Sequence, residues 1–187
     1  MASRDAPRRP TLYTIGHSTR TIQEFVEILK SAAVETVVDV RSIPRSRRHP
    51  DYNLDRLPGL LAEHGVGHEH VAQLGGRRSK SRDVSPDVNA FWENQSFHNY
   101  ADYALSAAFA TGLDRLLELA GQRRSAIMCS EAVWWRCHRR IVTDHLLARG
   151  HEVIHLMGPN QRTSAELTRG AVVVGEQVMY PKPGEDG

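Results

Sequence analysis

Short apolar runs typical of buried strands alternate along this chain with segments that have the apolar spacing of amphipathic helices. The strand-like runs span residues 12–15, 34–40, 68–74, 125–129 and 153–156. Helical spacing covers residues 22–29, 54–64, 113–120 and 136–149, and residues 91–111 hold one or two further helices. Strands separated by helices favour parallel pairing with right-handed crossovers. We therefore predict an α/β fold: a single three-layer domain in which helices flank a mainly parallel β-sheet.

The length of the chain, 187 residues, fits one domain with a substantial core. We place this α/β domain at residues 11–180, between a disordered N-terminal arm at residues 1–10 and a disordered tail at residues 181–187. Thr21, with Glu24 three residues later, predicts a capping box at the start of the first helix. Residues 160–180 show no clear pattern.

Composition and charge exclude several classes of protein and of binding partner. The net charge is only +2, so no global field demands a nucleic-acid partner. Two cysteines are too few for a disulfide scaffold. The polar start of the chain lacks the apolar core of a signal peptide, and no apolar run approaches the ~20 residues that span a bilayer. These features predict a cytoplasmic protein with no membrane partner.

Chemically distinctive residues follow four of the predicted strands. The four groups are Gly16-His17-Ser18, Asp39-Val40-Arg41, Gly75-Gly76-Arg77 and Cys129-Ser130-Glu131. The carboxyl ends of parallel strands share one edge of a sheet, where ligands of such folds bind. We therefore expect one shared pocket at this edge.

The two cysteines give this pocket its most reactive groups. Cys129 lies at a strand-to-helix turn, where backbone N–H groups and the helix dipole favour a thiolate or a bound anion. Cys129 is either a nucleophile or a small buried apolar residue. Cys137 is a resolving thiol, a metal ligand or, as we favour, a packing residue. The spacing of Cys129, Cys137 and His138 matches no common zinc motif, so we predict no metal site. No cofactor is identified.

Several neighbouring polar residues have two interpretations each. Glu131 is a general base or a carboxylate paired with Arg139 or Arg41, and we favour the pairing. His17 and Ser18 serve as an acid/base group and a hydrogen-bond donor, or they cap the next helix.

Two shorter features have similar alternatives. Asp39 is best explained as a structural ion-pair partner of Arg41, which remains a candidate for ligand binding. Gly75 and Gly76 are most simply a tight turn that requires positive φ, and the alternative is a loop that cradles a phosphate.

Positive charge accumulates at the same predicted edge. Basic residues crowd residues 41–48 and 77–82, and Arg136, Arg139 and Arg140 begin a helix there. One such run alone is usually a solvated loop. Three that converge suggest an anionic ligand: a nucleotide, a phosphorylated metabolite or a nucleic-acid backbone.

The chain resembles the domain-of-unknown-function 488 family between about residues 11 and 157. The resemblance rests on residues 14–18, 38–41 with Pro44, 74–77, 100–103 and the signature Cys129-x-Glu131…Cys137-His138-Arg139. It implies a functional site but no particular reaction. A weaker similarity to the rhodanese-like fold rests on residues 37–41, on Cys129 and on residues 145–156, and the chain departs from that fold at Glu131.

Two functional hypotheses follow. The first is a cysteine-centred enzyme that acts on an anionic phosphate- or sulfur-containing substrate, with Cys129, Glu131 and His17 as catalytic residues. Its substrate-binding residues would be Ser18, Arg41, Arg77, His138 and Arg139. The alternative is a nucleic-acid or nucleotide-binding module whose basic loops contact phosphates and whose cysteines only pack. The sequence specifies no oligomeric state.

Overall fold

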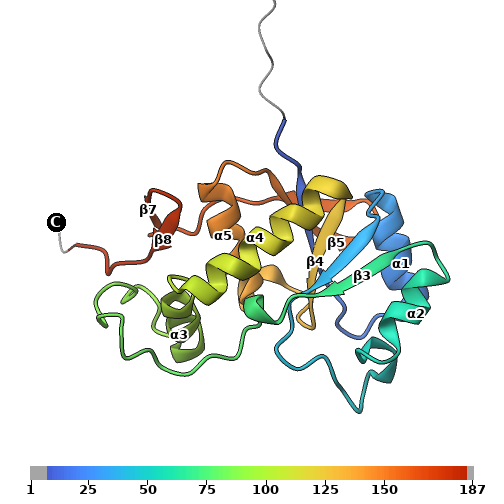
Figure 1. Ribbon diagram of the computed structural model, residues 1–187, viewed down its shortest axis with the longest axis horizontal. Helices are drawn as coiled ribbons and strands as arrows, with labels where there is room; N and C mark the ends of the chain where they lie inside the picture. The colour runs from blue at the N-terminus through green and yellow to red at the C-terminus, as the bar shows by residue number, and fades with distance from the viewer. Residues whose placement is uncertain (1–7, 185–187) are drawn as a thin grey trace, which may run out of the picture.

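The computed structural model describes residues 8–184 and centres on a six-stranded β-sheet (Figure 1). The sheet has the strand order β3-β2-β4-β1-β5-β6; β1 to β5 are parallel, and β6 pairs antiparallel with β5. Its strands are β1 (Leu12–Gly16), β2 (Thr36–Asp39), β3 (Gly67–His70), β4 (Ser125–Cys129), β5 (Val153–Gly158) and β6 (Gln161–Ser164). The predicted α/β class and mainly parallel sheet are confirmed. Residues 1–7 and 185–187, which belong to the predicted arm and tail, lie outside the described residues.

Within residues 8–184, five α-helices flank the sheet: α1 (Ile22–Ser31), α2 (Leu57–Ala62), α3 (Gln95–Tyr103), α4 (Ala107–Gln122) and α5 (Arg139–Ala148). Figure 1 shows α1 and α2 on one side of the sheet and α4 and α5 on the other. A separate hairpin is formed by β7 (Val172–Val174) and β8 (Gln177–Met179). Within the described part of the chain, no helix is both long and apolar enough to cross a membrane.

Side chains of the strands alternate between two buried clusters. Leu12 of β1 and Ile127 of β4 belong to the cluster beneath α4 and α5. Tyr13 and Ala126, their neighbours in sequence, belong to the cluster beneath α1 and α2. This alternation is the two-residue period of a strand, and it explains why the central strands are apolar on both faces.

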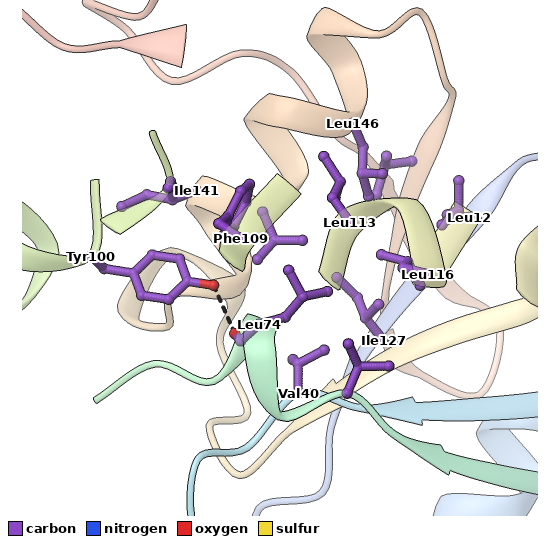
Figure 2. Close-up of a cluster of buried hydrophobic side chains, with 14 of the residues drawn as sticks. Leu12, Val40, Leu74, Tyr100, Phe109, Leu113, Leu116, Ile127, Ile141 and Leu146 are labelled. Atoms are coloured by element: carbon purple, nitrogen blue, oxygen red, sulfur yellow. Dashed lines mark hydrogen bonds between the residues drawn. The ribbon is translucent and has the colours of Figure 1, made fainter. Parts of the chain in front are cut away.

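Figure 2 shows the first cluster, in which Leu113 and Leu116 of α4 lie near Ile127. The cluster also contains Tyr100 of α3, whose side chain is fully buried. Its hydroxyl donates a hydrogen bond of 2.7 Å to the carbonyl of Leu74, so the buried polar group is satisfied. This bond ties α3 to the 3₁₀ turn Ala72–Leu74, which precedes the two glycines of the predicted pocket.

Local sequence signals were correct at some boundaries and wrong at others. The capping box is confirmed: the Thr21 hydroxyl accepts from the Glu24 N–H at 3.1 Å, and the Glu24 carboxylate accepts from the Thr21 N–H at 2.7 Å. The predicted helix at residues 113–120 is only part of α4. The predicted strand at residues 68–74 ends at His70, because a 3₁₀ turn follows.

Two further predictions needed correction. The helix predicted at residues 136–149 begins at Arg139, because Trp134–Arg136 forms a separate 3₁₀ turn. The helix predicted at residues 54–64 spans only Leu57–Ala62. Residues 160–180, which showed no clear pattern, contain β6, β7 and β8.

The order of the strands brings the ends of β1, β2 and β4 together. Gly16 lies opposite Cys129 in the parallel register, and Asp39 lies opposite Met128. A Cβ at Gly16 would overlap the backbone carbonyl of Glu131. The missing side chain therefore lets the segment after Cys129 cross over the end of β1.

Candidate functional site

A cavity of about 900 Å³ opens at the carboxyl ends of β1, β2 and β4, and we call it the rim cavity. Its volume is in the range typical of sites for small molecules. Six of the predicted site residues line it: His17, Arg41, Arg77, Cys129, Glu131 and His138. Ser18 does not line it and lies instead at a second hollow beside Arg20. Arg139 is buried behind the wall. The predicted pocket at the strand ends is therefore present.

Both cysteines lie in the wall of the rim cavity as free thiols. Cys129 ends β4, and Cys137 lies two residues before the start of α5. Their side chains are 3% and 5% exposed, and their sulfur atoms are 2.6 Å apart. The loop between the two cysteines thus has its ends close together, which places the Cys137 thiol against the Cys129 thiol.

The two thiols differ in acidity. Burial alone raises the pKa of Cys137, but a hydrogen bond from Cys129 and the charges of His138 and Arg139 lower it, and the net pKa lies well below the ordinary value. The backbone N–H of Arg139 also donates to the Cys137 sulfur at 3.4 Å. Burial and the neighbouring Cys137 raise the pKa of Cys129. Of the two thiols, Cys137 is therefore the one whose surroundings favour the thiolate.

Arg139 carries a buried positive charge next to this pair. Its side chain is 1% exposed and donates to the carbonyl of Glu131 at 2.7 Å and to the hydroxyl of Thr14 at 3.1 Å. Among residues 8–184, no carboxylate forms an ion pair with it. Burial lowers the pKa of Arg139, but the two cysteines raise it above its ordinary value. A buried charge is costly without a counter-ion, so the thiolate is the natural partner of this guanidinium.

His138 is held with one nitrogen toward Cys137. Its Nε2 donates to the carbonyl of Val40 at 2.8 Å, and its Nδ1 lies 3.5 Å from the Cys137 sulfur. With the proton on Nε2, Nδ1 presents a lone pair to the thiol. Cys137 and His138 are therefore arranged for transfer of a proton from the sulfur to the imidazole.

Gly75 and Gly76 do not have the positive φ that we expected of a tight turn. They are required for space. A Cβ at Gly75 would lie 2.6 Å from the Ser42 hydroxyl, and a Cβ at Gly76 would lie 2.5 Å from Nδ1 of His138. Gly76 thus forms the wall against which the His138 ring packs, and Gly75 lies against Ser42.

His17 is neutral over the physiological range. Burial, together with the charge of Arg41, lowers its pKa to about 4. Its Nδ1 donates to the Ser18 carbonyl at 2.9 Å, which leaves Nε2 as an acceptor 3.5 Å from a guanidinium nitrogen of Arg41. The ring stacks on Tyr52 with centroids 4.1 Å apart. His17 is therefore oriented as a hydrogen-bond acceptor at the rim cavity.

Arg41 is held by the predicted ion pair with Asp39. Its Nε and one terminal nitrogen donate to the two carboxylate oxygens at 2.8 and 2.6 Å. Asp39 is fully buried, and although burial alone raises its pKa, the hydrogen bonds from Arg41 and His68 lower it to about 2. The charge of Arg41 is thus largely neutralised.

Glu131 does not form the ion pair with Arg139 or Arg41 that we favoured from the sequence. Its carboxylate pairs with neither Arg139 nor Arg41, so the expected ion pair is wrong. Instead its backbone carbonyl accepts from Arg139, and its side chain is exposed at the rim cavity. The carboxylate is thus open to solvent and to a ligand.

Uncompensated positive charge surrounds the opening of the rim cavity. Arg45, Arg77 and Arg136 line it with exposed side chains, and within residues 8–184 none of them forms an ion pair. Arg78 is held in place by the carbonyls of Gly75 and Ala72. Among the described residues that line the cavity, Glu131 is the one carboxylate. This distribution favours an anionic ligand.

Two residues of the site have larger roles than the sequence predicts. The favoured prediction for Cys137 is a packing residue, although its position before a helix and beside His138 signals an activated thiol. Arg45 was predicted to bind an anion only as part of the basic run at residues 41–48 and was not named as a separate binding residue. Within the described chain, no three His, Cys, Asp or Glu side chains are grouped as for a metal ion.

Comparison with known protein families places the chain in one of them. The model of a family described as "Domain of unknown function DUF488" matches residues 21–146, a segment that contains both cysteines, Arg41, Arg77 and His138. No curated protein and no solved structure matches the chain. The weaker similarity to the rhodanese-like fold therefore finds no support.

Proposed function

The chain belongs to the DUF488 family, and we propose that it is an enzyme that uses its cysteine pair on an anionic substrate bound in the rim cavity. One observation carries the proposal. Arg139 is 1% exposed, has no carboxylate partner among residues 8–184, and lies beside two thiols that open onto the cavity. A thiolate that balances a buried guanidinium is an activated nucleophile.

Each residue then has a distinct role. Cys137 is the nucleophile, and Nδ1 of His138 receives its proton. Cys129 donates a hydrogen bond to the thiolate while it remains protonated. His17 accepts a hydrogen bond from the substrate, and the exposed carboxylate of Glu131 exchanges protons at the mouth of the cavity.

The substrate itself is bound by charge. Arg45, Arg77 and Arg136 attract and hold its anionic group, since their guanidinium groups are free to form bidentate hydrogen bonds with a phosphate or a carboxylate. The proposal includes a cytoplasmic location, because a reducing compartment keeps such a cysteine pair in the thiol form.

The test is alkylation with iodoacetamide as a function of pH, read at each cysteine by peptide mass spectrometry. We expect Cys137 to react with a midpoint well below the ordinary ~8.5 and Cys129 to react only at higher pH. The unfolded protein, in which both midpoints should return to about 8.5, is the control. Two inert thiols in the folded protein, or an ordinary midpoint at Cys137, would contradict the proposal.

The exposed arginines also support the alternative of a nucleic-acid-binding module. Such binding should weaken steeply with salt, since each phosphate contact releases counter-ions. Titration of single-stranded DNA and RNA at two salt concentrations separates the hypotheses. Tight, salt-sensitive binding that survives Cys137→Ser would favour the module, whereas its absence would favour the enzyme.

A further inference from the structure

We infer that the rim cavity performs thiol–disulfide exchange on a small anionic disulfide, with Cys137 as the attacking thiol and Cys129 as the resolving thiol. This inference rests on the proposed function and specifies its reaction. The electrophile would be a sulfur atom, rather than a phosphorus or carbon atom.

The position of Cys129 is the first argument. Its sulfur lies 2.6 Å from that of Cys137, so any group attached to Cys137 has a second thiol beside it. A mixed disulfide in that position is open to attack by Cys129. A phosphoryl or acyl group on Cys137 would instead require an attacking water, and a second thiol in contact with the nucleophile has no use in that reaction.

The charge of Arg139 is the second argument. In the resting state the thiolate of Cys137 balances Arg139 and raises the pKa of Cys129. When Cys137 enters a mixed disulfide, its negative charge is gone, while the guanidinium remains buried behind the cavity. The thiolate then favoured beside Arg139 is Cys129, because burial of an unpaired cation is unfavourable. The same buried charge therefore activates the two thiols in turn.

The reaction balances in two exchanges. The Cys137 thiolate attacks one sulfur of the disulfide R–S–S–R′, which forms Cys137–S–S–R and releases R′–S⁻. Cys129 passes its proton to R′–S⁻ through the cavity and attacks the Cys137 sulfur, which forms the Cys129–Cys137 disulfide and releases R–S⁻. The substrate gains two electrons and the cysteine pair loses two. A low-molecular-weight thiol of the cell must supply the two electrons that restore the dithiol.

The charge of the cavity mouth selects the substrate. Arg45, Arg77 and Arg136 are exposed there without ion-pair partners in the described chain, and the cavity is wide enough for a small disulfide. An anionic disulfide is attracted and a cationic one is repelled before either reaches Cys137. Preference between disulfides of opposite charge is thus an expected property of the site.

The experiment is a single-turnover reaction of the reduced full-length protein with oxidised glutathione, an anionic disulfide, or with cystamine, a cationic one. Samples are quenched in acid and analysed by mass spectrometry. We expect a transient glutathione adduct on Cys137, then the intramolecular disulfide. Cys129→Ser should stop the reaction at the adduct on Cys137, and Cys137→Ser should form no adduct at a comparable rate. An adduct on Cys129 first, or none on Cys137 in Cys129→Ser, would overturn the inference.

Charge selection is measured in the same assay. We expect oxidised glutathione to react about tenfold or more faster than cystamine at low salt, with the ratio falling as salt is added. Replacing Arg45, Arg77 and Arg136 by Gln should remove the preference. The matched control replaces Arg123, Arg169 and Lys182, which are exposed but do not line the cavity, and should retain it. Equal rates for the two probes in the native protein would contradict the anionic substrate class.

Alkylation of the same preparation with iodoacetamide separates two kinds of failure. A Cys137 that is alkylated at low pH but exchanges with neither disulfide would overturn the inference and leave the proposed function standing. A Cys137 that reacts with neither reagent would overturn both. Circular dichroism of each variant establishes that it is folded.

Discussion

Gly76 packs so closely against the imidazole of His138 that a Cβ there would lie 2.5 Å from Nδ1. The same nitrogen faces the sulfur of Cys137 at 3.5 Å, while Nε2 is fixed by the carbonyl of Val40. A backbone position from the loop after β3 therefore sets the direction of the ring that activates a thiol before α5. The absence of a side chain at Gly76 is thus a requirement of the site, and backbone conformation is not its cause.

Gly76→Ala should displace the His138 ring and raise the pKa of Cys137. We expect the pH midpoint for alkylation of Cys137 by iodoacetamide to rise by about one pH unit, because the thiolate loses the interaction with Nδ1. Gly121→Ala is the control, because a Cβ there meets no atom within 4 Å and replaces a glycine in α4. A Gly76→Ala protein with the alkylation profile of the native protein would show that Nδ1 does not activate the thiol.

Arg139 and Cys137 should be coupled only when the thiol is ionised. We expect Arg139→Met to lower the free energy of unfolding by about 3 kcal/mol, since it leaves the buried Cys137 thiolate without its counter-ion and removes the hydrogen bonds of the guanidinium. A double-mutant cycle with Cys137→Ser, measured by urea unfolding at several pH values, isolates the pair. The coupling energy should be present at pH 8 and fade as acid protonates the thiolate. A coupling energy that does not change with pH would show that the Cys137 thiolate is not the counter-ion of Arg139.

The buried Asp39–Arg41 pair should make stability depend on pH in acid. The pKa of Asp39 is about 2 in the folded protein against an ordinary 3.8. Its carboxylate therefore contributes about 2 kcal/mol that is fully present above pH 4 and is lost as the pH falls toward 2. Asp39→Asn should lose this dependence, as followed by urea unfolding between pH 2 and 6.

A control for this measurement is Glu118→Gln, which breaks an exposed ion pair with Arg115. Exposed pairs of this kind contribute little, so the variant should retain the native pH dependence. An Asp39→Asn protein whose stability changes with pH as the native protein's does would show that the buried pair is not its source.

Three buried histidines should stay neutral until the solution is strongly acidic. Burial lowers the pKa of each of His17, His145 and His155 to about 4, against an ordinary 6.5. Because the unfolded chain takes up these protons first, the stability contributed by the neutral rings is full above pH 6.5 and is lost as the pH falls toward 4. NMR titration of the ring Cε1–H signals should show no midpoint between pH 5 and 8 for these three residues. A midpoint near 6.5 for His17 would contradict its assignment as a neutral acceptor at the rim cavity.

Much of the fold could be predicted because it follows from patterns between residues close in sequence. Alternating strand and helix periods in residues 12–40 and 125–156 predict parallel pairing, and the Thr21–Glu24 capping box marks the start of α1. Parallel strands place their carboxyl ends on one edge, so the location of the rim cavity followed from the same argument.

The sequence by itself thus determined the fold class, the edge that holds the cavity and six of the residues that line it. Only the tertiary structure decided that Cys137 is the acidic thiol, that Cys129 lies against it, and that Arg139 is buried without a carboxylate partner within residues 8–184. The physical reason is the range of the interactions. Strand and helix periods act between neighbours in sequence, whereas the acidity of a thiol sums burial and charges from residues brought together by the whole fold.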